Sequence, residues 1–286
     1  MEQGLLCSAR MKALTPLFLA LFLSLGPPAA HAIINGSDAD PVKSASSVFL
    51  SFPDRAETRC TGVIVNSHLI LTAGHCFDDI SAGMKSIKIS NYSDGDSNLK
   101  NIELAKPWAR HPLYIKPAAN GEKKSLDIQN DIAYINTTNN LLEEFELAEK
   151  DLPKLFTNTE ALTAALMSQP HGMAYGYGLT TVGNNPRVER ENKKKELPVS
   201  LVLDSELNVI IVRSRIEDRG LCKGDSGGGI YTELNGETYV VGILSGVDGG
   251  CGTKDAYAAY SSISRNLCWI SQDSGLLGDL NLNCNP

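Results

Sequence analysis

The sequence lacks a basic excess, an apolar stretch long enough to span a membrane, and any strong compositional bias. Its 286 residues hold 26 lysines and arginines against 33 aspartates and glutamates, which gives a formal net charge of −7. This balance excludes the broad basic surface that is typical of nucleic-acid-binding proteins. With only 13 prolines, 25 glycines and 6% aromatic residues, the chain is neither collagen-like nor proline-rich. Hydrophobic residues make up 42% of it, enough for a sizeable core in one large or two small domains.

The only long apolar run, residues 13–25, is too short to cross a membrane, which takes about 20 apolar residues. It follows basic residues and leads to an Ala-His-Ala cleavage pattern that ends at Ala32. This order predicts a signal peptide over residues 1–32, not a membrane anchor, and a secreted protein, extracellular or periplasmic. The mature chain would begin at Ile33. In an alternative reading, cleavage near Gly26–Ala29 leaves a short propeptide for a second protease.

Cysteines are few, and none has the C-x-x-C spacing of a structural zinc site. Of the seven, Cys7 lies in the predicted signal peptide, so its removal leaves an even number. An even number of cysteines in an exported chain indicates disulfides, whose pairing the spacing alone leaves open. We therefore expect no metal or other cofactor. We expect three disulfides, formed by Cys60, Cys76, Cys222, Cys251, Cys268 and Cys284.

Short β-rich runs separated by turn residues recur along the rest of the chain, and this pattern predicts an all-β barrel or sandwich. Two segments, Asn140–Lys150 and Ser264–Gln272, have a helical pattern instead. The basic run Lys193–Lys195 is most simply a solvated loop. The predicted strands are residues 48–52, 62–65, 68–72, 87–89, 132–135, 199–203, 209–212 and 239–245.

Three chemistry-bearing residues follow one another in the order His, Asp, Ser. His75 ends a strand-like run beside a cysteine, and Asp131 enters an apolar strand, where a carboxylate is costly unless it is paired. Ser226 lies among glycines that allow a tight backbone turn. A serine hydroxyl is a poor nucleophile at neutral pH and needs a neighbouring base, so this set of residue types is suited to nucleophilic catalysis.

Together these segments resemble the trypsin/chymotrypsin family of serine endopeptidases, over essentially all of residues 33–286. The stretch Cys60–Cys76 is similar to the family's histidine segment, and Arg110–Tyr114 to the stretch before its aspartate. Tyr175–Gly178 resembles its Gly-Trp-Gly segment, with Tyr177 in place of tryptophan. The resemblance implies a chymotrypsin-like, all-β fold of two six-stranded antiparallel β-barrels with a C-terminal helix.

The same resemblance implies the domain organisation. We expect a first barrel over about 33–140, a linker over about 141–155 and a second barrel over about 156–262. A C-terminal helix and a disulfide-clamped tail would occupy 263–286. The active site would lie between the barrels, on loops from both.

The resemblance also implies secreted peptide-bond hydrolysis through an acyl-enzyme. In that chemistry His75 takes the proton of Ser226, and Asp131 orients the imidazole. The backbone amides of Gly224 and Ser226 would form the oxyanion hole. The alternatives are a catalytically inactive, protease-like binding module and an ester hydrolase. Against the ester hydrolase, no G-x-S-x-G elbow directly follows a predicted strand.

Two further expectations come from the family. In members of that family, a freed amino terminus pairs with the acid before the nucleophile. The resemblance therefore implies Ile33 and Asp225 as the activation pair. If the signal peptide is removed after Ala32, this pair needs no second cleavage. The family match also implies the disulfides Cys60–Cys76 and Cys222–Cys251, which leaves Cys268 to pair with Cys284.

The primary specificity pocket departs from the family pattern. Gly220 stands six residues before the nucleophile, where trypsin has an aspartate, and Ser245, Gly246 and Val247 would form the pocket edge. With Ala258 at the back wall, the pocket favours small or medium apolar side chains before the scissile bond. In the alternative alignment Asp255 reaches the back of the pocket and selects arginine or lysine.

The expected partners follow from this reading of the chain. They are polypeptide substrates and protein protease inhibitors, with no nucleic acid and no membrane anchor, and we expect a monomer.

Overall fold

The computed structural model describes residues 33–95, 97–116, 128–179, 193–204, 209–216, 218–248, 250–253 and 256–278, together with residues 280, 282 and 284. The predicted signal peptide and Asp255 lie outside the described residues. Among the helices of these ranges, none is long and apolar enough to cross a membrane.

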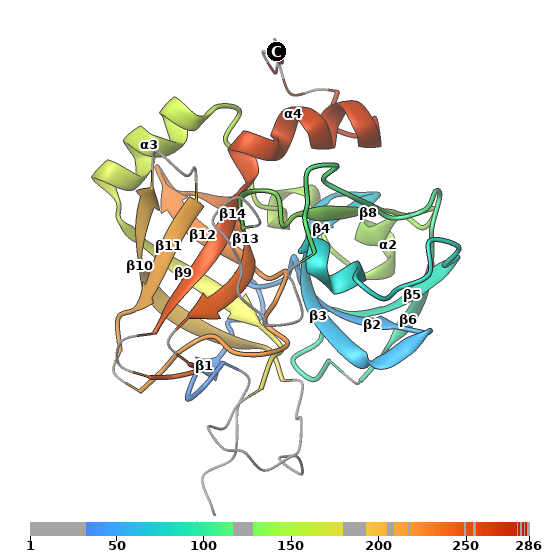
Figure 1. The fold of residues 1–286 in the computed structure, drawn as a ribbon, viewed down its shortest axis with the longest axis horizontal. Coiled ribbons are helices and arrows are strands. Elements are labelled where there is room, and N and C mark those ends of the chain that lie inside the picture. The colour runs from blue at the N-terminus through green and yellow to red at the C-terminus, as the bar shows by residue number, and fades with distance from the viewer. Residues whose placement is uncertain are drawn as a thin grey trace, which may run out of the picture.

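Two antiparallel sheets lie next to each other, one from each half of the chain (Figure 1). In each sheet, six strands are joined by a further strand of two residues. The first sheet has the order β6 (Lys100–Glu103), β5 (Ser86–Ser90), β2 (Ser47–Phe52), β3 (Arg55–Asn66), β4 (Leu69–Thr72), β8 (Ala133–Asn136) and β7 (Ala109–Arg110). The second has the order β1 (Ser37–Asp38), β10 (Lys195–Asp204), β11 (Val209–Ser214), β14 (Tyr257–Ser262), β13 (Glu237–Asp248), β12 (Gly229–Leu234) and β9 (His171–Gly176).

The second sheet closes on itself, because β10 pairs with both β11 and β9. Its strands show the period of two that a barrel requires: Leu197, Val199 and Leu201 of β10 point into the core, and Val202 is exposed. The first sheet is a half-barrel around its own apolar core. The expected chymotrypsin-like, all-β fold is confirmed, with one closed barrel and one half-barrel.

The segment that begins at Ile33 packs with the second sheet, although the sequence analysis placed it in the first barrel. β1 pairs with β10, and Ile34 exchanges two backbone hydrogen bonds with Gly220, at 2.8 and 3.2 Å. Ile33 is fully buried and belongs to the core of the second barrel. Such a long-range pairing leaves no local signal in the sequence.

The basic run near Lys194 is not a solvated loop, so that interpretation was wrong. Lys194 and Lys195 are 4% and 1% exposed. Nζ of Lys194 donates to the carbonyls of Ser44 and Asn91, at 3.0 and 2.6 Å, and burial lowers its pKa to about 7. Lys195 forms an ion pair with Asp38 of β1.

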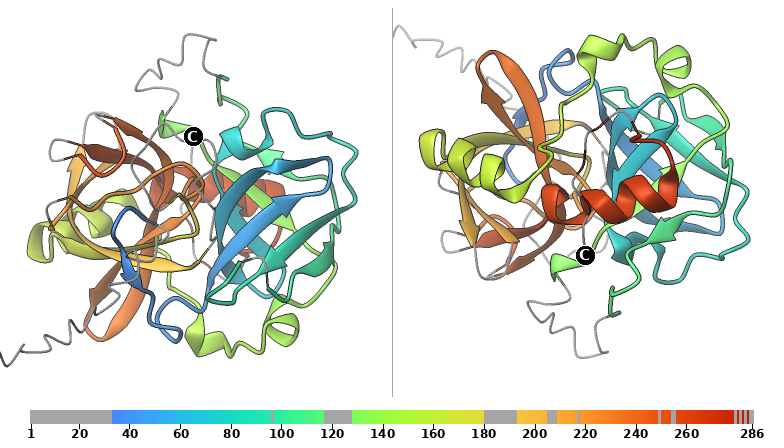
Figure 2. Two further views of the ribbon diagram at one scale, coloured as in Figure 1. Left: turned by 90° about the horizontal axis from the view of Figure 1, so that it is seen from below. Right: turned by 90° about the horizontal axis from the view of Figure 1, so that it is seen from above.

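The expected C-terminal helix is α4 (Ile263–Ser274), which lies across the junction of the two sheets (Figure 2, right). Its buried Ile263, Leu267 and Ile270 recur at helical spacing and pack into the first core. The helix expected over residues 140–150 is two short pieces, α2 (Leu141–Glu144) and the 3₁₀ helix η2 (Glu149–Asp151). A helix that the sequence analysis missed, α3 (Thr159–Ser168), directly precedes β9 of the second sheet.

Candidate active site

His75 and Asp131 come from the ends of two neighbouring strands. β4 leads into the 3₁₀ helix η1 (Gly74–Phe77), which carries His75, and Asp131 comes just before β8. Because Thr72 of β4 lies opposite Ala133 of β8, both side chains emerge at the same edge of the sheet. Nδ1 of His75 lies 2.8 Å from Oδ2 of Asp131, and the backbone N–H of His75 donates to Oδ1 at 2.8 Å. The carboxylate thereby fixes the orientation of the imidazole.

Asp131 is fully buried and receives a further hydrogen bond from the second barrel. Oγ of Ser245 donates to its Oδ2 at 2.6 Å. Ser245 lies at an irregularity in the pairing of β13, between Leu244 and Gly246, and such a bulge re-aims a side chain. The sequence analysis assigned Ser245 only to the pocket edge, because its contact lies 114 positions away in the chain.

Ser226 lies in the loop before β12, and this loop is attached to the first sheet. The N–H of Thr61 on β3 donates to the carbonyl of Ser226 at 2.8 Å, and its Oγ1 donates to the carbonyl of Gly224 at 3.0 Å. At Gly227, φ is +83° and a Cβ would lie 2.1 Å from Oγ1 of Thr72, so only glycine fits. Contacts across the two barrels thus set the position of Ser226.

The amides of Gly224 and Ser226 have no hydrogen-bond partner within the part of the chain that the structure describes. Gly224 has a φ of +98°, a left-handed conformation that sets the direction of the peptide groups beside it. Two such N–H groups next to a serine hydroxyl are suited to bind a negatively charged oxygen.

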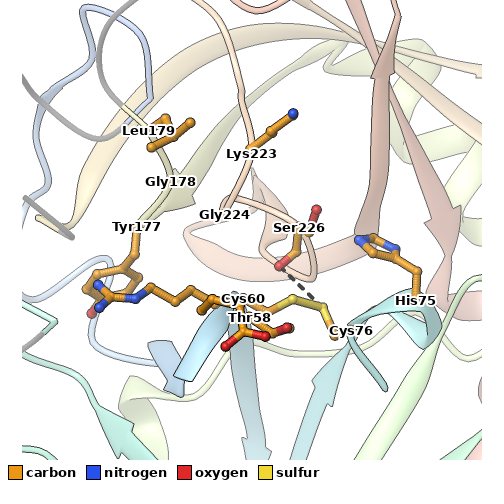
Figure 3. Close-up of a pocket in the computed structure, with 12 residues that line it drawn as sticks. Thr58, Cys60, His75, Cys76, Tyr177, Gly178, Leu179, Lys223, Gly224 and Ser226 are labelled. Carbon is orange, nitrogen blue, oxygen red and sulfur yellow. Dashed lines mark hydrogen bonds between the residues drawn. A yellow bond between two sulfur atoms is a disulfide. The ribbon is translucent and has the colours of Figure 1, made fainter. Parts of the chain in front are cut away.

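A cavity of about 280 Å³ opens at Ser226 and His75. Figure 3 shows the imidazole ring of His75 directed toward Ser226, with the Cys60–Cys76 disulfide beneath the two side chains. The opposite wall is formed by Tyr177–Leu179. The cavity therefore brings together the histidine and the serine that the sequence analysis singled out.

Asp225, the acid before Ser226, is fully buried beneath the loop. Its carboxylate accepts hydrogen bonds from the backbone N–H groups of Gly178 and Cys222, at 2.7 and 2.8 Å. Burial nonetheless raises its pKa to about 7, because two amides do not replace the lost water. A Cβ at Gly178 would lie 2.6 Å from Oδ1 of Asp225, so the carboxylate lies close to the backbone that follows β9. Among the described residues, no hydrogen bond joins Asp225 to Ile33, the other member of the expected activation pair.

Three of the predicted specificity residues border a second, much smaller cavity of about 20 Å³, whereas Ser245 and Gly246 are not in its lining. Gly220, Val247 and Ala258 line it, and Val247 lies opposite Ala258 in the pairing of β13 with β14. A volume of this size holds about one water molecule. Gly246 lies opposite Ala259, and Asp255, the alternative specificity residue, is outside the described residues.

The structure contains three disulfides, as expected: Cys60–Cys76, Cys222–Cys251 and Cys268–Cys284. The first ties η1, and with it His75, to β3. The sulfurs of Cys60 and Cys76 and a ring nitrogen of His75 lie within 4.8 Å of one another. Because both sulfurs belong to the disulfide, this cluster offers no thiolates to a metal ion.

Comparison with known proteins agrees with the geometry. The family model described as Trypsin matches residues 33–270. The urokinase-type plasminogen activator of Gallus gallus is 26% identical over 254 residues, covering 84% of this chain and 57% of the relative. The CLIP domain-containing serine protease B4 of Anopheles gambiae is 25% identical over 75% of this chain and 61% of the relative. Vitamin K-dependent protein C of Oryctolagus cuniculus is 22% identical over 74% of this chain and 45% of the relative.

The chain thus spans about half to three fifths of the length of these relatives. The match to the family model covers both sheets, the loop that carries Ser226 and most of α4. The resemblance drawn from the sequence is therefore confirmed, and the chain belongs to the trypsin family.

Proposed function

We propose that the chain is a serine endopeptidase, in which Ser226 is the nucleophile, His75 the general base and acid, and Asp131 the group that orients His75. The observation that carries the proposal is the pair of hydrogen bonds, each 2.8 Å, that hold His75 on Asp131 at the edge of the Ser226 cavity. With Nδ1 occupied by the carboxylate, Nε2 is left to accept the proton of the Ser226 hydroxyl.

In the first half of the reaction, Oγ of Ser226 attacks the carbonyl carbon of the peptide bond while His75 takes its proton. The negative charge that develops on the carbonyl oxygen is stabilised by the amides of Gly224 and Ser226. Loss of one such donor typically costs about 3 to 4 kcal/mol of transition-state stabilisation. His75 then gives its proton to the leaving amine, and an acyl-enzyme on Ser226 remains. Water, activated by the same imidazole, releases the acid.

Activation would depend on the amino group of Ile33. The segment Ile33–Ile34 already packs against the second barrel, and Ile34 is bonded to Gly220 in the loop that leads to Ser226. An ammonium group freed at Ile33 would supply the positive charge that the buried Asp225 lacks, since its carboxylate has only two amide partners in the described structure. Removal of residues 1–32 as a signal peptide would create this group without a second cleavage.

For the residue before the scissile bond, we propose a preference for small or medium apolar side chains. The support is the small cavity beside Gly220, which the apolar Val247 and Ala258 line; the one charged residue of its described lining, Arg219, donates to Oγ of Ser37 at 3.2 Å. Peptides that differ only at this position, with Ala, Val, Leu, Phe, Arg or Lys, test the preference. Dominant cleavage after Arg, abolished in Asp255→Ala, would support the alternative instead.

The proposal extends to the setting in which the enzyme acts. Three disulfides fit an oxidising compartment, so we propose an exported, monomeric protein that acts on polypeptides and is subject to protein inhibitors. The two barrels, divided by a linker near residues 141–155, would form one peptidase unit.

Labelling with a fluorophosphonate tests the nucleophile directly. The chain that begins at Ile33 should take up one label at Ser226, and Ser226→Ala should take up none. Ser81→Ala, at an exposed serine away from the cavity, is the matched control and should be labelled like the parent. Folded protein that stays unlabelled and cuts no peptide would favour an inactive, protease-like binding module.

A further inference from the structure

Asp78 connects the short helix of His75 to a second segment of the first sheet. It caps the C-terminus of η1, and its backbone N–H donates to the carbonyl of His75 at 3.1 Å. Its carboxylate accepts a hydrogen bond from the hydroxyl of Tyr114, which lies 3.1 Å from both oxygens, and one from Nη1 of Arg110 at 3.1 Å. The Asp78 side chain is only 18% exposed, so water competes little for these bonds.

The ring of Tyr114 reaches the His75–Asp131 pair through Gly74, the residue before His75. A Cβ at Gly74 would lie 3.2 Å from Cδ2 of Tyr114 and 3.2 Å from Oδ1 of Asp131. This Oδ1 is the oxygen that accepts the backbone N–H of His75. Because packed protein interiors have few voids, a displacement of the ring is passed on to the backbone and the carboxylate beside it.

The segment that carries Tyr114 is also bonded to the strand that follows Asp131. β7 pairs with β8, and the N–H of His111 donates to the carbonyl of Ile132 at 2.9 Å. The N–H of Tyr114 in turn donates to the carbonyl of His111 at 2.9 Å. Tyr114 therefore links the strand of Asp131, through its backbone, to the helix of His75, through its hydroxyl.

The surroundings of Tyr114 keep its hydroxyl protonated. Burial raises the pKa of Tyr114 well above its ordinary value, and the charges of Asp131 and Asp78 raise it further. The guanidinium of Arg110 lies 5.0 Å from the centroid of the Tyr114 ring and also compensates the charge of Asp78. The hydroxyl therefore remains a donor to Asp78 throughout the neutral pH range.

We propose that Tyr114 and Asp78 are positioning residues, whose hydrogen bond fixes η1 relative to β8 and thereby holds the imidazole of His75 on the carboxylate of Asp131. This inference rests on the proposed endopeptidase function. Neither residue lines the cavity at Ser226, so both act through the His75–Asp131 pair and are not catalytic residues. Ser245 holds the same carboxylate from the second barrel.

Tyr114→Phe tests the proposal, because it removes the hydroxyl and keeps the ring. We expect kcat on a peptide to fall about tenfold at an unchanged KM, since displacement of reacting groups by about 1 Å can cost a hundredfold. The rate of labelling by a fluorophosphonate should fall by a similar factor, because that reaction uses the same serine and imidazole.

Tyr134→Phe is the matched control. It removes another hydrogen bond from a tyrosine to an aspartate, the one from Tyr134 of β8 to Asp273 of α4, and leaves the contacts of η1 intact. Both variants should lower Tm to a similar extent, and Tyr134→Phe should keep the parent kcat. A general loss of stability therefore does not mimic the expected effect.

Variants of Asp78 identify the hydrogen bond as the cause. Asp78→Asn keeps an oxygen that accepts from Tyr114, so it should retain at least about half of the parent kcat. Asp78→Leu removes the acceptor and should lose as much activity as Tyr114→Phe. The double variant Tyr114→Phe/Asp78→Leu should be little worse than either single one, because both changes break the same bond.

The outcomes separate this inference from the proposed function. Equal kcat values of Tyr114→Phe and Tyr134→Phe would overturn the positioning role and leave the endopeptidase in place. Equal losses in Asp78→Asn and Asp78→Leu would show that the charge of Asp78, not its bond to Tyr114, sustains activity, and would overturn the proposal. A parent protein that cuts no peptide and takes up no label would overturn both.

Discussion

Thr61 of the first barrel is bonded to Gly224 of the second, through its Oγ1 and the carbonyl, at 3.0 Å. The N–H of the same threonine holds the carbonyl of Ser226 at 2.8 Å. Ser226 belongs to the second barrel by sequence, while His75 and Asp131 belong to the first. The relative position of hydroxyl and imidazole therefore depends on how the barrels are joined, and Thr61 is a direct link between them.

Replacement of Thr61 by valine removes the hydroxyl and keeps the shape. We expect kcat to fall at least tenfold, since displacement of reacting groups by about 1 Å can cost a hundredfold. The free energy of unfolding should fall by about 2 kcal/mol, because the hydroxyl also accepts a hydrogen bond from the backbone N–H of Tyr177 at 3.3 Å and the variant loses both bonds. Thr232→Val is the matched control, because Oγ1 of Thr232 donates to the carbonyl of His171 at 3.0 Å, away from the cavity. Equal activity of the two variants would contradict the prediction.

Because Asp225 is buried, we expect the stability of the unprocessed chain to depend on pH. Removal of residues 1–32 should abolish this dependence. Burial raises the folded-state pKa of Asp225 from 3.8 to about 7, so the folded chain holds a proton that the unfolded chain loses. The chain with Ala32 still attached should therefore lose stability as the pH rises from about 4 to 7, by roughly 4 kcal/mol in total, and change little above that.

In the chain that begins at Ile33, the free ammonium would favour the ionised carboxylate and offset this loss. Urea unfolding of both forms between about pH 4 and 8 measures the difference. Asp225→Asn in the extended form should flatten its profile over the same range. The prediction fails if both forms show the same dependence on pH.

The disulfides Cys60–Cys76 and Cys268–Cys284 form a matched pair, since each spans 16 residues. In the chain-entropy model, loss of either should cost a similar stability, about 3 kcal/mol. Only the first holds the helix η1 that carries His75. We expect the double serine variant of either pair to lower Tm, and only the Cys60/Cys76 variant to lower kcat/KM strongly. A large loss of activity in the Cys268/Cys284 variant would show that the tail acts on the site.

The size of the cavity beside Gly220 predicts a change of specificity in Val247→Gly. Removal of the isopropyl group should let larger residues enter, and cleavage after Leu or Phe should gain on cleavage after Ala. Val202→Gly, at a residue of β10 that is 63% exposed, controls for the effect of glycine in a strand. An unchanged preference in Val247→Gly would place the selective contact elsewhere.

Local patterns in the sequence predicted most of the scaffold. The apolar, β-branched runs mark β2, part of β3, β4, β5, β8, β10, β11 and β13, and the helical spacing of apolar residues marks α4. The strand β14 was missed because Tyr257–Ser262 is mostly small and hydroxylated, and β12 because it starts at Gly229 in a glycine-rich segment. The helix α3 has a weak apolar periodicity and gave no clear signal.

In the candidate site, the limits of prediction follow from chain separation. His75, Asp131 and Ser226 were found because each lies in a recognisable local motif. The hydrogen bond of Ser245 to Asp131 joins positions 114 residues apart, and that of Thr61 to Gly224 joins positions 163 residues apart. Such contacts form only in the assembled fold, and a single serine or threonine in a strand gives no local sequence pattern that predicts them.

The burial of Lys194 and Lys195 has a practical consequence. Their amines face backbone carbonyls and Asp38 instead of water, so an amine-selective acylating reagent should modify them only after the molecule opens. Mass spectrometry of these adjacent lysines would then give a chemical footprint of the intact fold, without any substrate.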